Sequence, residues 1–145
     1  MIELGAPGPS DVVYDLGCGD GRVVIEAVRR SGARGVCVDI DPKLVRQAQA
    51  NAARAGVADR IQFRTEDLFV TDIHDASVVM LFLWPEINLR LLPKLRRELL
   101  PGARIVSNMH DMGTFQPTRI IPIRSSRPGH RPHNVYLWQL PARMD

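Results

Sequence analysis

The chain has 145 residues, of which 45% are hydrophobic and 24% are charged, and its formal net charge is +3. This length predicts a single domain over residues 1–145 and argues against a second one. No apolar stretch approaches the roughly 20 residues that span a bilayer, and the N-terminus lacks the basic start and apolar centre of a signal peptide. We therefore expect a soluble, cytoplasmic protein that does not insert into a membrane.

The positive charge gathers toward the C-terminus, where residues 101–145 hold six arginines against Asp111 and Asp145. Arginine binds planar anions such as phosphate, but arginine-rich usage also follows coding bias. Nucleic acid is therefore disfavoured as a partner. An RNA partner bound by Arg124, Arg127 and Arg131 ranks last among the alternatives.

Cysteine and histidine spacing predicts neither a disulfide nor a metal site. Cys18 and Cys37 lie 19 positions apart in apolar surroundings, which indicates two reduced core residues. His130 and His133 have no third ligand nearby, so we expect no bound metal.

Apolar segments of strand length alternate along the chain with helical patterns, which predicts an α/β fold with a parallel sheet. Asp41 is placed to cap the second helix, which ends near Gly56. The last two strands form an antiparallel hairpin. The expected strands are 11–16, 35–40, 61–64, 76–83, 103–107, 119–123 and 134–140, and the other expected helices are 22–30 and 87–100.

The sequence VVYDLGCGDGR, residues 12–22, joins the first strand to the first helix through a glycine-rich turn. Gly17, Gly19 and Gly21 let the backbone turn sharply and approach a ligand, while N–H groups at the helix start face the crevice. Arg22 stands where a dinucleotide fingerprint needs its last glycine, and no GxxxxGK motif is present. This argues against NAD, FAD and P-loop nucleotide binding.

Carboxylates follow the first three strands. Asp39 ends the second strand, where it can accept both ribose hydroxyls of an adenosine, and Asp67 follows the third, where it can take the adenine amine. Ile40 or Leu68 would stack on that adenine. With Asp15 beside the turn, the site favours a cation over a pyrophosphate, which points to the sulfonium of S-adenosylmethionine.

These residues carry a family resemblance. VVYDLGCGDGRVVIEAV, VCVDIDPKLVRQAQANA and RIQFRTEDLF resemble the first three motifs of class I (Rossmann-like) S-adenosylmethionine-dependent methyltransferases. The later segment VVMLFLWPEINLRLLPKLRRELLPGARIVS is similar to bacterial and archaeal relatives of the protein-lysine methyltransferases that act on the ATP synthase c-subunit and the adenine nucleotide translocase. The resemblance covers residues 11–141.

The resemblance implies a seven-stranded, mostly parallel sheet ordered 3-2-1-4-5-7-6, with helices on both faces. It implies that Trp84, Pro85 and Glu86 line the acceptor entrance. The cofactor residues that it implies are Asp15, Gly17, Gly19, Gly21, Asp39 and Asp67. Related proteins carry a further segment before the first strand, and only MIELGAPGPS stands there in this sequence. We expect that segment to be missing, which affects cofactor affinity and activity.

We therefore predict a methyltransferase that acts on protein lysine, with a small-molecule methyltransferase and an inactive cofactor-binding module as alternatives. Methyl transfer needs little beyond a neutral nucleophile held in line, so no catalytic triad is expected. Glu86 is the candidate for steering the lysine ammonium, and His110 and Asp111 are placed where they can face it. DNA methylation is disfavoured, because LWPE replaces the Asn/Asp-Pro-Pro-aromatic motif and neither cysteine fits cytosine chemistry.

Overall fold

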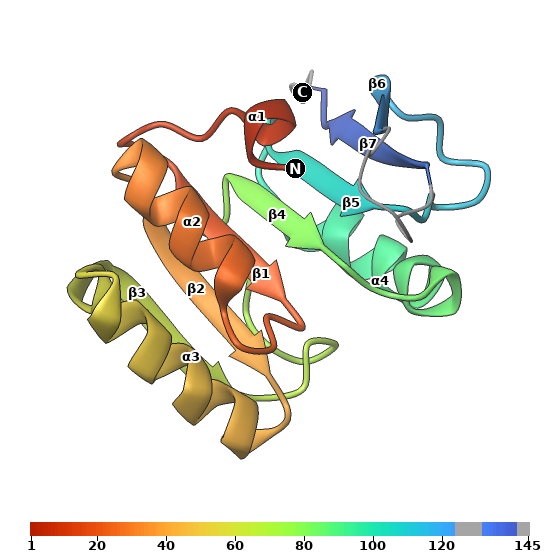
Figure 1. Cartoon of the computed structure of the whole chain (residues 1–145). Coiled ribbons are helices and arrows are strands. Elements are labelled where there is room, and N and C mark those ends of the chain that lie inside the picture. The colour runs from red at the N-terminus through yellow and green to blue at the C-terminus, as the bar shows by residue number, and fades with distance from the viewer. Residues whose placement is uncertain (124–131, 142–145) are drawn as a thin grey trace.

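The computed structural model describes residues 1–123 and 132–141, whose seven strands form one sheet with the order β3-β2-β1-β4-β5-β7-β6 (Figure 1). Neighbouring strands among β1 to β5 are parallel, and β7 pairs antiparallel with both β5 and β6. The predicted order and the C-terminal antiparallel pair are confirmed. The strands are β1 Val12–Leu16, β2 Arg34–Asp39, β3 Ile61–Thr65, β4 Val78–Leu81, β5 Arg104–Asn108, β6 Arg119–Ile123 and β7 His133–Gln139.

Helices cover both faces of this sheet, as the resemblance implied. The helices are α1 Ile2–Gly5, α2 Arg22–Ser31, α3 Pro42–Arg54, the 3-10 turn η1 Ala58–Arg60 and α4 Pro85–Glu98. Apolar side chains of α1, α2 and α3 pack on the face that carries Val13, Cys37 and Met80. Helix α4 packs on the opposite face, where Leu16 and Val79 lie.

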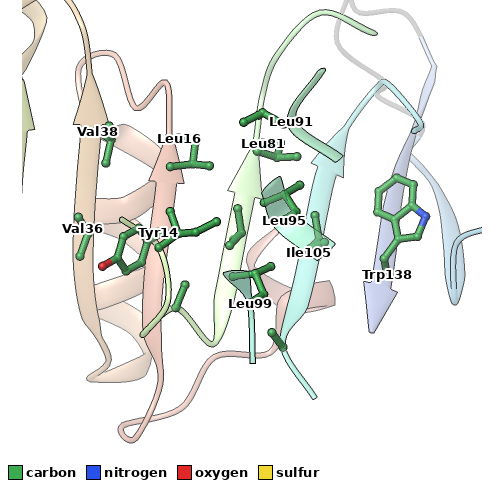
Figure 2. Packing of buried hydrophobic residues seen from close by; sticks show 14 of the residues in the cluster. Tyr14, Leu16, Val36, Val38, Leu81, Leu91, Leu95, Leu99, Ile105 and Trp138 are labelled. Carbon is green, nitrogen blue, oxygen red and sulfur yellow. The ribbon is translucent and has the colours of Figure 1, made fainter. Parts of the chain in front are cut away.

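The largest core cluster lies between α4 and the sheet (Figure 2). Leu91, Leu95 and Leu99 recur at helical spacing and turn one apolar stripe of α4 toward the strands. Strand β1 is buried on both faces, since Tyr14 and Leu16 belong to this cluster while Val13 belongs to the cluster under α2. This explains why the central strands read as continuous apolar runs.

The structure differs from the sequence prediction most at α1 and β4. The turn η1 was also not predicted, and α4 begins and ends two residues before the predicted 87–100. Helix α1 was not predicted, because four residues are too few to show a helical period. Strand β4 is shorter than the predicted 76–83. The chain leaves the sheet after Leu81, so that Phe82 and Trp84 are 61% and 71% exposed, and this apolar segment forms surface rather than core.

The pairing of the cysteines corrects the sequence prediction. Cys18 and Cys37 form a disulfide, with Cα atoms 5.4 Å apart, so the prediction of two reduced residues was wrong. The reason lies in the turn after β1, which folds over the neighbouring strand. There the N–H of Cys18 donates to the carbonyl of Val38 at 3.0 Å. Spacing along the chain could not show this contact, because it depends on the pairing of β1 with β2.

Reduction of the disulfide is expected to lower the free energy of unfolding by about 3 kcal/mol, because the cross-link joins residues 19 positions apart and restricts the unfolded chain. Urea denaturation with and without reductant measures this. In a Cys18→Ala/Cys37→Ala variant, reductant should leave the midpoint unchanged. Two free thiols in the denatured, unreduced protein would contradict the pairing.

Within residues 1–123 and 132–141, every helix is too short or too polar to cross a bilayer. The same part of the chain has no group of three His, Cys, Asp or Glu side chains placed to hold a metal ion. His130, Arg124, Arg127 and Arg131, on which two of the alternatives depend, lie outside the described residues.

Candidate functional site

The glycine turn folds back over β2 at the carboxyl edge of the sheet, where β1 and β2 end (Figure 1). The N–H of Gly17 donates to the carbonyl of Val38 at 2.8 Å, and Gly17, Gly19 and Gly21 all have positive φ. A Cβ on Gly21 would lie 3.0 Å from the Cβ of Ala48, so glycine there also allows close packing of α3. A Cβ on Gly19 would meet nothing within 4 Å, which shows that this part of the turn faces open space.

Asp39 fastens this turn to the end of β2. Its Oδ2 accepts a hydrogen bond from the N–H of Gly19 at 3.0 Å, and its Oδ1 accepts one from the N–H of Asp41 at 2.9 Å. Asp41 itself caps α3, accepting from the N–H of Lys43 at 2.9 Å. The predicted helix cap at Asp41 is therefore confirmed, while the ribose contact of Asp39 stays a prediction.

A pocket of about 460 Å³ opens beside Asp39, and we call it the carboxylate pocket. Five of its lining residues were predicted as cofactor-binding, namely Gly17, Asp39, Ile40, Asp67 and Leu68. Asp67 is half-buried, and its Oδ1 accepts from the N–H of Phe69 at 2.9 Å. The remaining lining residues are Glu66, Phe69, Leu83, Ile87 and Arg90.

Sequence reasoning missed the contribution of α4 to this pocket. The guanidinium carbon of Arg90 lies 4.4 Å from the ring centroid of Phe69, and both side chains line the pocket with Ile87. Ile87 and Arg90 are three positions apart and so share one helix face. That spacing is visible in the sequence, but only the packing of α4 shows which face meets the pocket.

Asp15 lies beneath the glycine turn and does not line the carboxylate pocket. Burial raises the pKa of Asp15 to about 7; a backbone hydrogen bond from Val24 opposes the shift, while the charges of Asp39 and Asp20 add to it. The buried carboxyl is therefore partly protonated near pH 7, and a cofactor role for Asp15 stays a prediction.

Asp15→Asn is expected to flatten the pH dependence of stability. The folded-state pKa of Asp15 is about 7, against a usual value of 3.8, so the folded state holds a proton that the unfolded state has lost between about pH 4 and pH 7. Stability contributed by this group falls as pH rises through that window and is lost above it. At pH 8 the variant should be more stable than the wild type, by on the order of 2 kcal/mol.

Urea denaturation at pH 5 and pH 8 provides the measurement. Asp72→Asn is the matched control, because hydrogen bonds from His74 lower the pKa of Asp72 and the charge of Asp72 does not contribute to the shift of Asp15. Identical pH profiles for the wild type and Asp15→Asn would contradict the assignment.

Of the predicted acceptor residues, Trp84 lines a second hollow together with His110, and we call this hollow the apolar slot. It has a volume of about 190 Å³ and is lined by Phe82, Leu83, Trp84, Asn108, Met109 and His110. The Trp84 and His110 rings have centroids 5.9 Å apart. Leu83 lines both hollows, so the slot and the carboxylate pocket meet at one side chain.

Pro85 and Glu86 follow Trp84 in the first turn of α4. Pro85 is the first helical residue, a position where its missing N–H costs nothing. Glu86 is exposed and lines neither hollow. Asp111 is also exposed, whereas His110 lines the slot.

The residues present fit an adenosine with a cationic substituent. Carboxylates of Asp39 and Asp67 supply hydrogen-bond acceptors, Ile40 and Leu68 supply apolar surface, and Gly19 leaves open space beside the turn. A carboxylate-rich crevice at the carboxyl edge of this sheet, with an apolar slot beside it, fits the class I methyltransferases that the sequence resembles, which use S-adenosylmethionine.

Comparison with known proteins identifies the family within this class. The model of the ANTKMT methyltransferase domain matches residues 15–119. The chain therefore belongs to the ANTKMT methyltransferase domain family, and the predicted class, enzyme type and methyl donor are confirmed.

Curated relatives carry lysine methyltransferase names. A protein-lysine N-methyltransferase of Saccharolobus islandicus is 37% identical over 139 residues, which is 95% of this chain and 84% of the relative. The adenine nucleotide translocase lysine N-methyltransferase of Mus musculus is 34% identical over 117 residues, 81% of this chain and half of the mouse protein.

Among solved structures, one described as an RNA methyltransferase from Salinibacter ruber in complex with S-adenosyl-L-homocysteine is 46% identical, with a TM-score of 0.88. The match covers 99% of this chain and 90% of that one. The similar proteins thus agree on methyl transfer and differ in the acceptor that their descriptions name.

Proposed function

We propose that this methyltransferase transfers the methyl group to the ε-amino group of a protein lysine. The observation that carries the proposal is the apolar slot, which is about 190 Å³ in volume and meets the carboxylate pocket at Leu83. Small-molecule pockets are typically about 300–1,000 Å³. A smaller slot with apolar walls suits one unbranched alkyl chain, such as the four methylenes of lysine. The lysine methyltransferase names of the relatives support the same acceptor.

In the proposed reaction, bound S-adenosylmethionine supplies an electrophilic methyl group on sulfur. The lysine nitrogen must be neutral to attack, and an apolar environment favours its neutral form by disfavouring the ammonium. The alkyl chain would lie against the Trp84 and His110 rings, which both line the slot, and the displaced proton would leave to water. We assign exposed Glu86, at the start of α4, to attracting the ammonium before it enters.

RNA is the second candidate acceptor, because the description of the 46% identical structure names it. The proposal is tested by incubating the protein with isotopically labelled S-adenosylmethionine and a cell lysate, then treating samples with protease or ribonuclease. Labelled methyl-lysine in the acid hydrolysate, removed from the macromolecular fraction by protease alone, is the expected result. Label in nucleosides would contradict it, and label on small molecules would select that alternative.

Cofactor binding without transfer to any acceptor would identify the chain as an inactive binding module. Asp39→Ala is the matched control for background label, since it alters the cofactor site. We also propose the cytoplasm as the place of action. A disulfide such as Cys18–Cys37 is uncommon in reducing compartments, so in the cytoplasm we expect both cysteines to be reduced and to be alkylated in intact cells. Protection of both cysteines from alkylation would contradict a cytoplasmic location.

A further inference from the structure

The loop after β5, residues 109–111, lines the apolar slot with Met109 and His110, and we call it the β5 loop. Met109 has a φ of 74°, in the left-handed region that residues with side chains rarely adopt. Such a backbone conformation persists only where its surroundings hold it. The contacts that hold the β5 loop therefore also determine where Met109 and His110 lie in the slot.

Hydrogen bonds hold this loop from two sides. On the side of β7, the N–H of Met109 donates to the carbonyl of Asn134 at 2.8 Å. From β5, the hydroxyl of Ser107 donates to the carbonyl of His110 at 2.6 Å. Ser107 is fully buried, so this bond forms away from competing water.

Asn88 of α4 holds the loop from the other side. Its Nδ2 lies 3.2 Å from the carbonyl of His110, 3.3 Å from that of Asp111 and 3.1 Å from the hydroxyl of Ser107. Asn88 is fully buried, and its Oδ1 has no hydrogen-bond partner among the described residues. Burial of the Asn88 Oδ1 without a hydrogen-bond partner costs free energy. The bonds of its Nδ2 to the β5 loop and to Ser107 offset this cost.

The position of Asn88 connects the two rings of the slot. Its own N–H donates to the carbonyl of Trp84 at 3.1 Å, one turn earlier in the chain. The same residue thus touches the start of α4, which carries Trp84, and the loop that carries His110. Movement of the β5 loop away from Asn88 would change the 5.9 Å separation of the Trp84 and His110 rings.

We propose that Asn88 and Ser107 are positioning residues for the acceptor: they hold Met109 in its left-handed conformation and keep His110 opposite Trp84. The inference rests on the proposed function of the slot. It predicts that loss of these bonds weakens use of the acceptor and leaves the cofactor site intact, since neither residue lines the carboxylate pocket.

The first test is kinetic, with a lysine peptide that the wild type methylates. Asn88→Leu and Ser107→Ala are expected to raise KM for the peptide at least tenfold while KM for S-adenosylmethionine changes less than twofold. Asn51→Leu is the reciprocal control, because Asn51 donates to the carbonyl of Asp20 in the glycine turn at 2.9 Å. That variant should raise KM for the cofactor and spare KM for the peptide. Equal changes in both constants for Asn88→Leu and Ser107→Ala would overturn the inference.

The second test needs no acceptor. Hydrogen exchange should become faster at residues 108–112 in Asn88→Leu and Ser107→Ala, with exchange in β2 unchanged. In Met109→Gly the residue adopts its positive φ without the steric cost that a side chain brings. Asn88→Leu should therefore accelerate exchange less when it is added to Met109→Gly than when it is made in the wild type. Unchanged exchange at 108–112 in both single variants overturns the inference, as does faster exchange with an unchanged KM for the peptide. A wild type that methylates no lysine overturns the proposed function alone.

Discussion

Asp39→Ala is expected to weaken S-adenosylmethionine binding by about 1–3 kcal/mol, or roughly 5- to 150-fold in Kd. The carboxylate has two roles that the substitution removes together. It is the predicted acceptor for the ribose hydroxyls, and it holds the glycine turn through the bond from the N–H of Gly19 at 3.0 Å. Calorimetric titration of the folded variant gives the change in affinity.

Asp41→Ala is the matched control for this substitution. It removes a carboxylate two residues away that caps α3 and does not line the carboxylate pocket. We expect it to cost about 1 kcal/mol of stability and to leave cofactor affinity unchanged. Equal affinities for wild type and Asp39→Ala would refute the ribose assignment.

Trp84→Ala should reduce kcat/KM for a lysine peptide by roughly 10- to 100-fold, on the order of 1.4–2.7 kcal/mol of transition-state stabilisation. The indole is 71% exposed, so its removal creates no core cavity, and the free energy of unfolding should change by less than about 0.5 kcal/mol. What is lost is one wall of the apolar slot opposite His110. Cofactor affinity should stay the same.

Leu89→Ala provides the comparison for Trp84→Ala. Leu89 is a 49% exposed apolar residue of the same helix that lines neither hollow. Its removal should leave kcat/KM within about twofold of the wild type. If both variants lose activity equally, the loss belongs to α4 in general, and Trp84 has no special place in acceptor binding.

Much of the sheet and of the glycine turn could be predicted because their signals are local. The apolar runs of β1, β2 and β4 reflect burial on both faces, and the spacing of Gly17, Gly19 and Gly21 reflects a backbone that needs positive φ three times in five residues. Asp39 follows from the same logic, since the carboxyl ends of neighbouring parallel strands lie side by side.

The features that escaped prediction depend on contacts between distant segments. The Cys18–Cys37 disulfide requires the glycine turn to lie over β2. Arg90 lines the carboxylate pocket because α4 turns the helix face that carries Ile87 and Arg90 toward it. Met109 carries no sequence signal for a left-handed φ, because its N–H bonds to Asn134 of β7 and the next carbonyl, that of His110, bonds to Asn88 of α4. Local propensity cannot report such contacts.

We expect the crevice at the carboxyl edge of β1, β2 and β3 to bind S-adenosylmethionine. Calorimetric titration of the wild-type chain with S-adenosylmethionine and S-adenosylhomocysteine measures this binding. We predict one site per chain with micromolar affinity for both, weakened by Asp39→Ala. Absence of heat with either ligand, in a chain shown by circular dichroism to be folded, would contradict this expectation.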